Sequence, residues 1–166
     1  LDAAQYVLRR ASEARTFDWY PLFHYGFLFY HFRKDPATGA QWLLKGVPRV
    51  SNQQDAWALQ NVAAAWIEKG YQTVNAATMV DAMAADSPPG AFRNYLQVRA
   101  RRLRDLAALQ DAATLFQARH GRGVVKLEEL VSAGLIAELP KDPLGFGFGL
   151  DAAGRPILNS GAAGRQ

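Results

Sequence analysis

The sequence contains no cysteine, which excludes disulfides, thiolate zinc sites and cysteine nucleophiles. It has few β-branched residues and much alanine, a composition that favours closely packed helices. It carries little net charge, formally +4, and this is too weak to indicate nucleic-acid binding without a localised patch. We expect no signal peptide within these residues. We also expect no membrane-spanning run, because Pro21, His24 and His31 interrupt the aromatic stretch 20–32.

What the sequence does have is an ordinary globular balance, with 49% hydrophobic and 20% charged residues among 166. This length suits one compact domain, or a short repeat array with a small cap. Aromatic residues make up 11% and are concentrated in the first half of the chain. The compartment stays undecided on these grounds, because a chain without disulfides suits either a periplasm or a cytosol.

Apolar periodicity and breaker residues predict a mainly α-helical chain. Asp18 and Asp35 are candidate N-caps, and glycine or proline follows most of the predicted helices. We expect helices over residues 1–15, 18–32, 35–45, 55–69, 73–84, 91–119 and 126–133, then strands around 146–150 and 156–158 joined by a hairpin loop at 151–154. The predicted domains are 1–90, made of helical hairpins, and 91–166, a long helix with a small α/β appendage.

A pattern of small and bulky residues recurs after 37 positions. The first copy is Leu22, Tyr25, Gly26, Phe29, Gly39, Leu43 and Gly46, and the second is Leu59, Val62, Ala63, Trp66, Ala76, Val80 and Met83. Two antiparallel helices approach closely only where one side chain is small. We therefore predict that Gly26, Ala63, Gly39 and Ala76 are the packing positions of two helical hairpins.

This pattern resembles a degenerate tetratricopeptide repeat, with two units over residues 18–86. The resemblance implies an α-solenoid of antiparallel helix hairpins with a groove that receives a peptide or a helix. The sequence departs from the family in its spacing, which is longer than the usual 34 residues, and in having leucine where the family has tryptophan. The alternative is that two unrelated amphipathic hairpins agree by chance.

A second resemblance covers about a quarter of the chain near its C-terminus. Its residues are Gly121-Arg122, Leu127-Glu128-Glu129-Leu130 and Pro140-Lys141-Asp142-Pro143-Leu144-Gly145. They are similar to the globular part of type II secretion pseudopilins and type IV pilin-like proteins, although Gly123-Val124 replaces Tyr-Pro and the hydrophobic pilin helix is absent. The resemblance implies an extracytoplasmic, envelope-associated setting. Because the chain opens with Leu1, we expect a trimmed N-terminus that an anchor could precede, and a periplasmic or membrane-anchored location over a cytoplasmic one.

Catalytic chemistry finds little support in the sequence. His24 and His31 are seven residues apart, whereas ligands on one helix usually lie three or four apart. No serine has a Gly-x-Ser-x-Gly setting, no carboxylates pair for acid–base work, and 145–149 reads as a strand with phenylalanine on one face. We predict no catalytic residue, metal or cofactor. The arginines at 99, 101, 102 and 104 are interpreted as a solvated face, with no nucleic-acid partner.

The aromatic residues are too numerous for one buried helix face, so some should meet a partner. The candidates for protein binding are Trp19, Tyr20, Tyr30, Trp42 and Trp57. The function expected is a non-catalytic protein–protein interaction module or assembly subunit of an envelope-associated complex, either monomeric or oligomeric. The alternatives are an accessory component of a type IV pilus or type II secretion-like apparatus and, least favoured, a hydrolase or metal enzyme.

Overall fold

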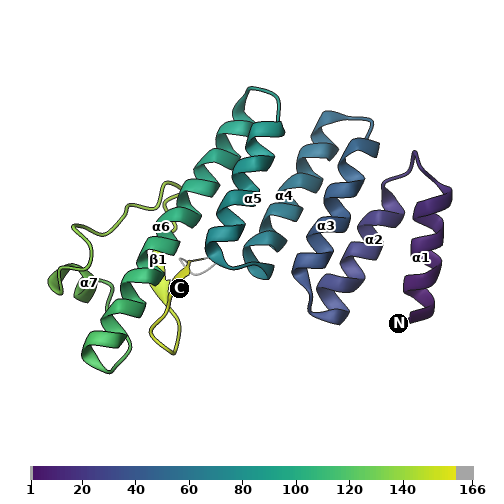
Figure 1. The fold of residues 1–166 in the computed structure, drawn as a ribbon. Coiled ribbons are helices and arrows are strands. Elements are labelled where there is room, and N and C mark those ends of the chain that lie inside the picture. The colour runs from purple at the N-terminus through teal and green to yellow at the C-terminus, as the bar shows by residue number, and fades with distance from the viewer. Residues whose placement is uncertain (1, 160–166) are drawn as a thin grey trace, which may run out of the picture.

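The computed structural model describes residues 2–159, so Leu1 and the last seven residues of the predicted second domain lie outside the described part. This part is mainly helical, at 68%, with seven α-helices and one antiparallel sheet of two strands. Figure 1 shows helices α1 to α6 standing side by side in chain order, each packed against the next. The C-terminal elements lie at the end of this row, beside α6. The predicted mainly α class is therefore confirmed.

The helices and strands follow the predicted order closely. The six long helices are α1 (Asp2–Ala14), α2 (Tyr20–Leu28), α3 (Pro36–Gly46), α4 (Gln53–Gly70), α5 (Thr73–Asp86) and α6 (Ala91–His120). A π-helical turn, η1 (Phe29–Arg33), follows α2, and a 3₁₀ turn, η2 (Val47–Arg49), follows α3. The C-terminal elements are α7 (Glu128–Ser132), β1 (Phe148–Leu150) and β2 (Pro156–Leu158).

Side-chain caps set where two of the helices begin. The Asp35 carboxylate accepts a hydrogen bond from the Thr38 amide at 3.0 Å, which confirms the predicted cap of α3. Hydrogen bonds from Thr38 hold the pKa of Asp35 below its usual value. Helix α4 begins earlier than predicted, because Asn52 accepts from the Asp55 amide at 2.8 Å and is the N-cap. Asp18 is not the N-cap of α2, although its carboxylate accepts from the Tyr20 amide at 2.9 Å.

The predicted aromatic helix over 18–32 is interrupted. Its α-helical part stops at Leu28, and the chain widens into the π-helical turn η1. Lys34 then adopts a left-handed conformation with φ of 55°, and the Asp35 amide bonds to the Phe29 carbonyl at 3.0 Å. Periodicity at 3.6 residues per turn cannot reveal such a widening, because the side-chain pattern does not break there.

The core has two clusters that meet on α6. The first fills the spaces between α3, α4, α5 and the first half of α6, with fully buried Leu43, Ile67, Val80 and Leu96. The second packs the other half of α6 against α7 and the C-terminal segment, around Leu109, Phe116 and Leu130. The first cluster contains residues from both predicted domains, 1–90 and 91–166, whereas the second lies within 91–166. Helix α6 therefore contributes side chains to both clusters.

The two strands pair antiparallel, with Phe148 opposite Leu158 and Leu150 opposite Pro156. The predicted hairpin loop is confirmed, since the Asp151 carboxylate accepts from the Ala153 amide at 2.9 Å. The predicted strand over 146–150 is too long. Gly145 and Gly147 have φ of 77° and 78°, left-handed values that turn the chain before the strand begins.

Candidate functional site

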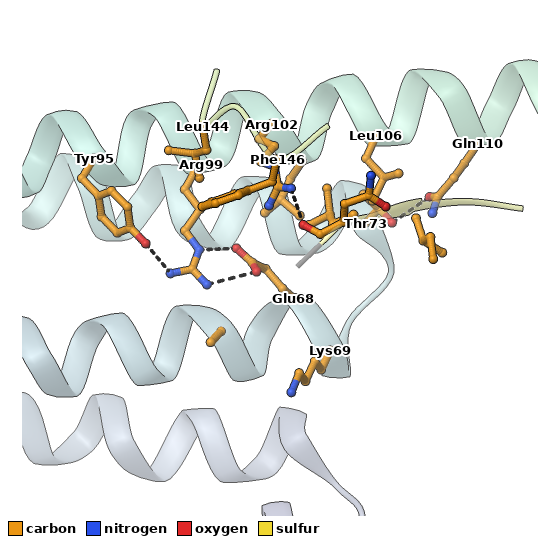
Figure 2. Close-up of a pocket in the computed structure, with 15 residues that line it drawn as sticks. Glu68, Lys69, Thr73, Tyr95, Arg99, Arg102, Leu106, Gln110, Leu144 and Phe146 are labelled. Carbon is orange, nitrogen blue, oxygen red and sulfur yellow. Dashed lines mark hydrogen bonds and ion pairs between the residues drawn. The ribbon is translucent and has the colours of Figure 1, made fainter. Parts of the chain in front are cut away.

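A groove of about 500 Å³ lies between α4, α6 and the C-terminal segment. Figure 2 shows most of its labelled side chains gathered between these elements, whereas Lys69 extends from α4 away from the others. The lining mixes apolar and polar groups, namely Ala65, Glu68, Lys69, Thr73, Tyr95, Arg99, Arg102, Leu103, Leu106, Gln110, Leu144, Phe146, Ile157, Leu158 and Asn159. Sites of this size and mixed character are typical of ligand and peptide binding.

Helical spacing brings these side chains to one side of each helix. On α4, Glu68 and Lys69 follow Ala65 by three and four residues, so all three lie on the same side of the helix. On α6, the lining positions run from Tyr95 to Gln110 with the same periodicity. At one end of α4, Trp57 stacks on Phe92 of α6, with ring centroids 5.4 Å apart and 20° between the planes.

Arg99 and Glu68 form the central ion pair of the groove. The Arg99 Nε and Nη2 donate to the two Glu68 oxygens, the second at 3.0 Å, and Nη1 donates to Asn61 Oδ1 at 2.7 Å. The same Nη1 lies 3.2 Å from the Tyr95 hydroxyl, as Figure 2 shows. Burial alone would lower the pKa of Arg99, but the hydrogen bond and charge of Glu68 outweigh it and leave the pKa raised.

Arg102 joins α6 to the C-terminal segment. Its Nε donates to Asp142 Oδ2 at 2.9 Å, and its Nη2 donates to the carbonyls of Asn159 at 2.8 Å and Gly147 at 3.3 Å. The interpretation of the arginine run as a solvated face is therefore wrong for Arg99 and Arg102, which are buried and paired. The interpretation is correct for Arg104, whose side chain is exposed and pairs with the exposed side chain of Asp81.

Lys69 is the third cation of the groove and is exposed. Its Nζ donates to the Tyr30 hydroxyl at 2.9 Å, and the Tyr30 ring stacks on Trp66 with centroids 4.4 Å apart. Among residues 2–159, no carboxylate lies within ion-pair distance of Lys69. The groove therefore holds two neutralised arginines and one cation whose described partner is uncharged.

The predicted binding residues lie in four separate places. Trp57 packs between α4 and α6, and Tyr30 lies over Trp66 beside Lys69. Trp19 lines a smaller hollow between α2 and α4, and its neighbour Tyr20 is 56% exposed. Trp42 packs edge-on against Tyr25 at 4.6 Å, with Lys45 Nζ 4.1 Å above its ring.

The predicted packing residues lie at helix contacts. A side chain on Gly26 would meet the Gly39 carbonyl at 2.7 Å, and one on Gly39 would meet the Gly26 carbonyl at 2.9 Å. Helices α2 and α3 therefore touch through these two glycines. Ala63 on α4 and Ala76 on α5 are fully buried in the first cluster.

The sequence interpretation missed the groove residues Lys69, Arg99 and Arg102. A signal for the two arginines is present, because adding 37 to Leu59, Ala63 and Trp66 gives Leu96, Ala100 and Leu103. All three of these α6 residues are buried. Recognition of this third copy would have indicated that Arg99 and Arg102, which lie between Leu96 and Leu103, are on a packed helix.

The three histidines pack against aromatic side chains. His24 lies edge-on to Tyr20, His31 stacks on Phe27, and His120 stacks on Phe116. Within the described part of the chain, no three metal-binding side chains gather in a group that could hold an ion. No helix in residues 2–159 has both the length and the apolar character needed to cross a bilayer.

Comparisons with known proteins identify no relative. The sequence matches no family model, and neither a curated protein nor a solved structure matches the chain significantly.

Proposed function

We propose that the chain is a non-catalytic protein–protein interaction module, or an assembly subunit of an envelope-associated complex, which binds its partner along α2, α4 and α6. The observation that carries this proposal is the groove, whose rim holds half-exposed apolar side chains. Tyr95, Phe146 and Ile157 are 36%, 50% and 40% exposed. Exposed aromatic and aliphatic groups around a hollow are typical of protein interfaces.

The placing of α2, α4 and α6 on one binding face rests on a repeated pattern of burial. Leu22, Leu59 and Leu96 are all buried, and each is 37 residues from the next. The small residues Gly26, Ala63 and Ala100 keep the same spacing and are also buried. This supports an α-solenoid of tetratricopeptide-like units, with α2, α4 and α6 as the first helices of successive units.

Side-chain contacts across the row support the same arrangement. Tyr30 of η1 reaches Trp66 of α4, and Trp57 of α4 reaches Phe92 of α6. If α2, α4 and α6 contact one another through such aromatic pairs, they form a continuous surface on which aromatic residues recur. Such a surface suits recognition of a peptide or helix by shape and apolar contact.

The carboxylates nearest the groove have structural roles, which supports binding over catalysis. Both oxygens of Glu68 accept from Arg99. Asp142 accepts from Arg102 and from the amides of Leu144 and Gly147. A general acid or base needs access to a substrate proton, and these two groups are occupied by permanent donors.

A second candidate, an accessory component of a pilus or secretion apparatus, is favoured by contacts among the pilin-like residues. Arg122 donates two hydrogen bonds to Glu129, at 2.7 and 3.2 Å, and Glu129 accepts from the Val125 amide at 2.8 Å. Asp142, in the Pro-Lys-Asp-Pro segment, is tied to α6 through Arg102. The residues that carry the resemblance thus have defined structural roles in the appendage.

Site-specific photo-crosslinking in the cells that produce the protein tests the proposed binding face. Benzoylphenylalanine would replace Ile157, exposed on the rim of the groove, and, as a matched control, Ala82, exposed on α5. We expect a discrete crosslinked partner from position 157 and none from position 82. Equal crosslinking from both positions, or none from position 157, would contradict the proposal.

A further inference from the structure

We propose that the groove between α4 and α6 binds a partner segment in which an acidic side chain lies next to an aliphatic or aromatic one. This inference rests on the proposed function, because it names the chemistry of the partner that the groove receives.

The first argument is the charge of the groove. Glu68 neutralises Arg99 by a bidentate pair, and Asp142 neutralises Arg102. Lys69 remains as a positive charge whose described contacts are the Tyr30 hydroxyl and, at 5.4 Å, the Tyr30 ring. A ligand that brought a second cation would be repelled, whereas a carboxylate would complete the balance.

The second argument is a donor of Arg102 that the fold holds in place. The Arg102 side chain is 9% exposed, and its Nε and Nη2 are fixed by Asp142, Gly147 and Asn159. Because the guanidinium is planar and rigid, these bonds also fix the direction of Nη1. Nη1 has no partner among residues 2–159, and Arg102 lines the groove. A pre-oriented guanidinium nitrogen is a strong donor to carboxylate oxygen.

The third argument is the apolar wall beside these donors. Leu103 and Leu106 of α6 form one side, and Leu144 and Ile157 of the C-terminal segment form the other. A volume of about 500 Å³ has room for one or two large side chains. A carboxylate alone would leave this wall exposed to water, so the segment that fits must carry an apolar residue next to the acid.

Selection of displayed peptides tests the inference without knowledge of the natural partner. The probes are random twelve-residue peptides, and binders are remade with an acetylated N-terminus and an amidated C-terminus, so that only side chains supply carboxylates. We expect the selected sequences to place Asp or Glu beside Leu, Ile or Phe. Replacing that acid by its amide should weaken binding by about tenfold, and higher salt should weaken it further.

Substitutions in the chain locate the bound acid. Lys69→Met should weaken the acidic peptide by about tenfold, whereas Lys45→Met, which removes the lysine above Trp42, should leave binding unchanged. Ile157 is exposed, so its variants should fold. Ile157→Glu and Ile157→Lys lose the same apolar contact, and the Glu variant should bind much more weakly than the Lys variant.

The outcomes separate this inference from the proposed function. If no peptide is selected, or if the selected peptides are insensitive to every groove variant, peptide binding by the groove fails. If the peptides bind and respond equally to Ile157→Glu and Ile157→Lys, and amidation of their acid has no effect, the groove binds peptides but the acidic chemistry is wrong. Binding that requires a free C-terminal carboxylate would also overturn the assignment to an acidic side chain.

Discussion

Arg102 on α6 and Asp142 in the C-terminal segment form an ion pair, Nε to Oδ2 at 2.9 Å, across 40 residues of sequence. The Asp142 side chain is only 2% exposed. Its carboxylate also accepts from the Leu144 amide at 2.9 Å and the Gly147 amide at 2.7 Å. The turn that leads into β1 is thus built around a buried negative charge, and Arg102 is the only cation paired with it in residues 2–159.

Removing the positive charge of Arg102 should therefore lower the free energy of unfolding substantially. Arg102→Met keeps much of the apolar stem but leaves the Asp142 carboxylate buried and unpaired. We expect a loss of about 3–5 kcal/mol in the free energy of unfolding, as is usual when one partner of a buried pair is removed. Urea denaturation measures this loss, and hydrogen exchange should show faster exchange in residues 142–159.

The matched control is Arg104→Met, on the same helix. Arg104 pairs with Asp81, but both side chains are about half exposed. Surface pairs contribute about 0–1 kcal/mol, so this variant should lose little stability. An equal loss in the two variants would contradict the special role of the buried pair.

Gly26→Ala tests the contact between α2 and α3. The added carbon would lie 2.6 Å from Leu43 Cδ1 and 2.7 Å from the Gly39 carbonyl, and the carbonyl cannot move without the helix. We expect a loss of about 1–3 kcal/mol in the free energy of unfolding, measured by denaturation. Gly46→Ala is the control, because its nearest neighbour is the flexible end of Leu59 at 3.3 Å. It should be near neutral, and a loss as large as that of Gly26→Ala would contradict the close-approach argument.

Local signals in the sequence were enough to predict most of the helices. Asp35 before Pro36 marks the start of α3 and caps it as predicted. Glycines at 70 and 121 stand at the ends of α4 and α6. These features act within a few residues, so a single sequence contains the information needed. The π-helical turn after Leu28 was not predictable in this way, because it leaves the local pattern unchanged.

The groove was harder to predict, because its chemistry depends on partners far apart in the chain. Arg99 meets Glu68 across 31 residues. Only the recurrence of the small and bulky pattern at Leu96, Ala100 and Leu103 indicates that Arg99 lies on a packed helix, and it does not identify Glu68 as the partner. Trp57 was predicted as a binding residue because the aromatic residues are too numerous for one buried helix face, and in the structure its ring stacks on Phe92. Which residues form such pairs depends on the register between neighbouring helices. The periodicity of a single helix carries no information about that register.

Acid should loosen the contact between the end of α6 and α7. The hydrogen bond from Arg122 lowers the pKa of Glu129 from its ordinary 4.5 to about 2, and the Val125 amide adds to this. A depressed pKa means that the charged form stabilises the folded state above pH 4.5, and this contribution is lost as the pH falls towards 2. We expect the hydrogen-exchange protection of residues 122–132, corrected for the intrinsic exchange rate at each pH, to decrease over this range.

Glu129→Gln should remove most of that pH dependence, because the amide cannot titrate. Glu128→Gln serves as the control, since the Glu128 side chain is exposed and makes no ion pair in the described structure. It should keep the wild-type pH profile. If both variants kept that profile, some group other than Glu129 would be responsible for the acid sensitivity.

Substitutions of Trp57 test whether its aromatic ring or its indole N–H stabilises the contact between α4 and α6. The ring stacks on Phe92, but Nε1 is buried and has no hydrogen-bond partner among residues 2–159. Trp57→Phe keeps an aromatic ring over Phe92 and removes the unpaired donor, so the two effects partly offset each other. We expect it to stay within about 1 kcal/mol of the wild type, and Trp57→Ala to lose about 3–5 kcal/mol. Denaturation of both variants measures the difference. A Phe variant as unstable as the Ala variant would show that the indole N–H is hydrogen-bonded in the folded protein, and the stacked ring would then not be the main source of stability.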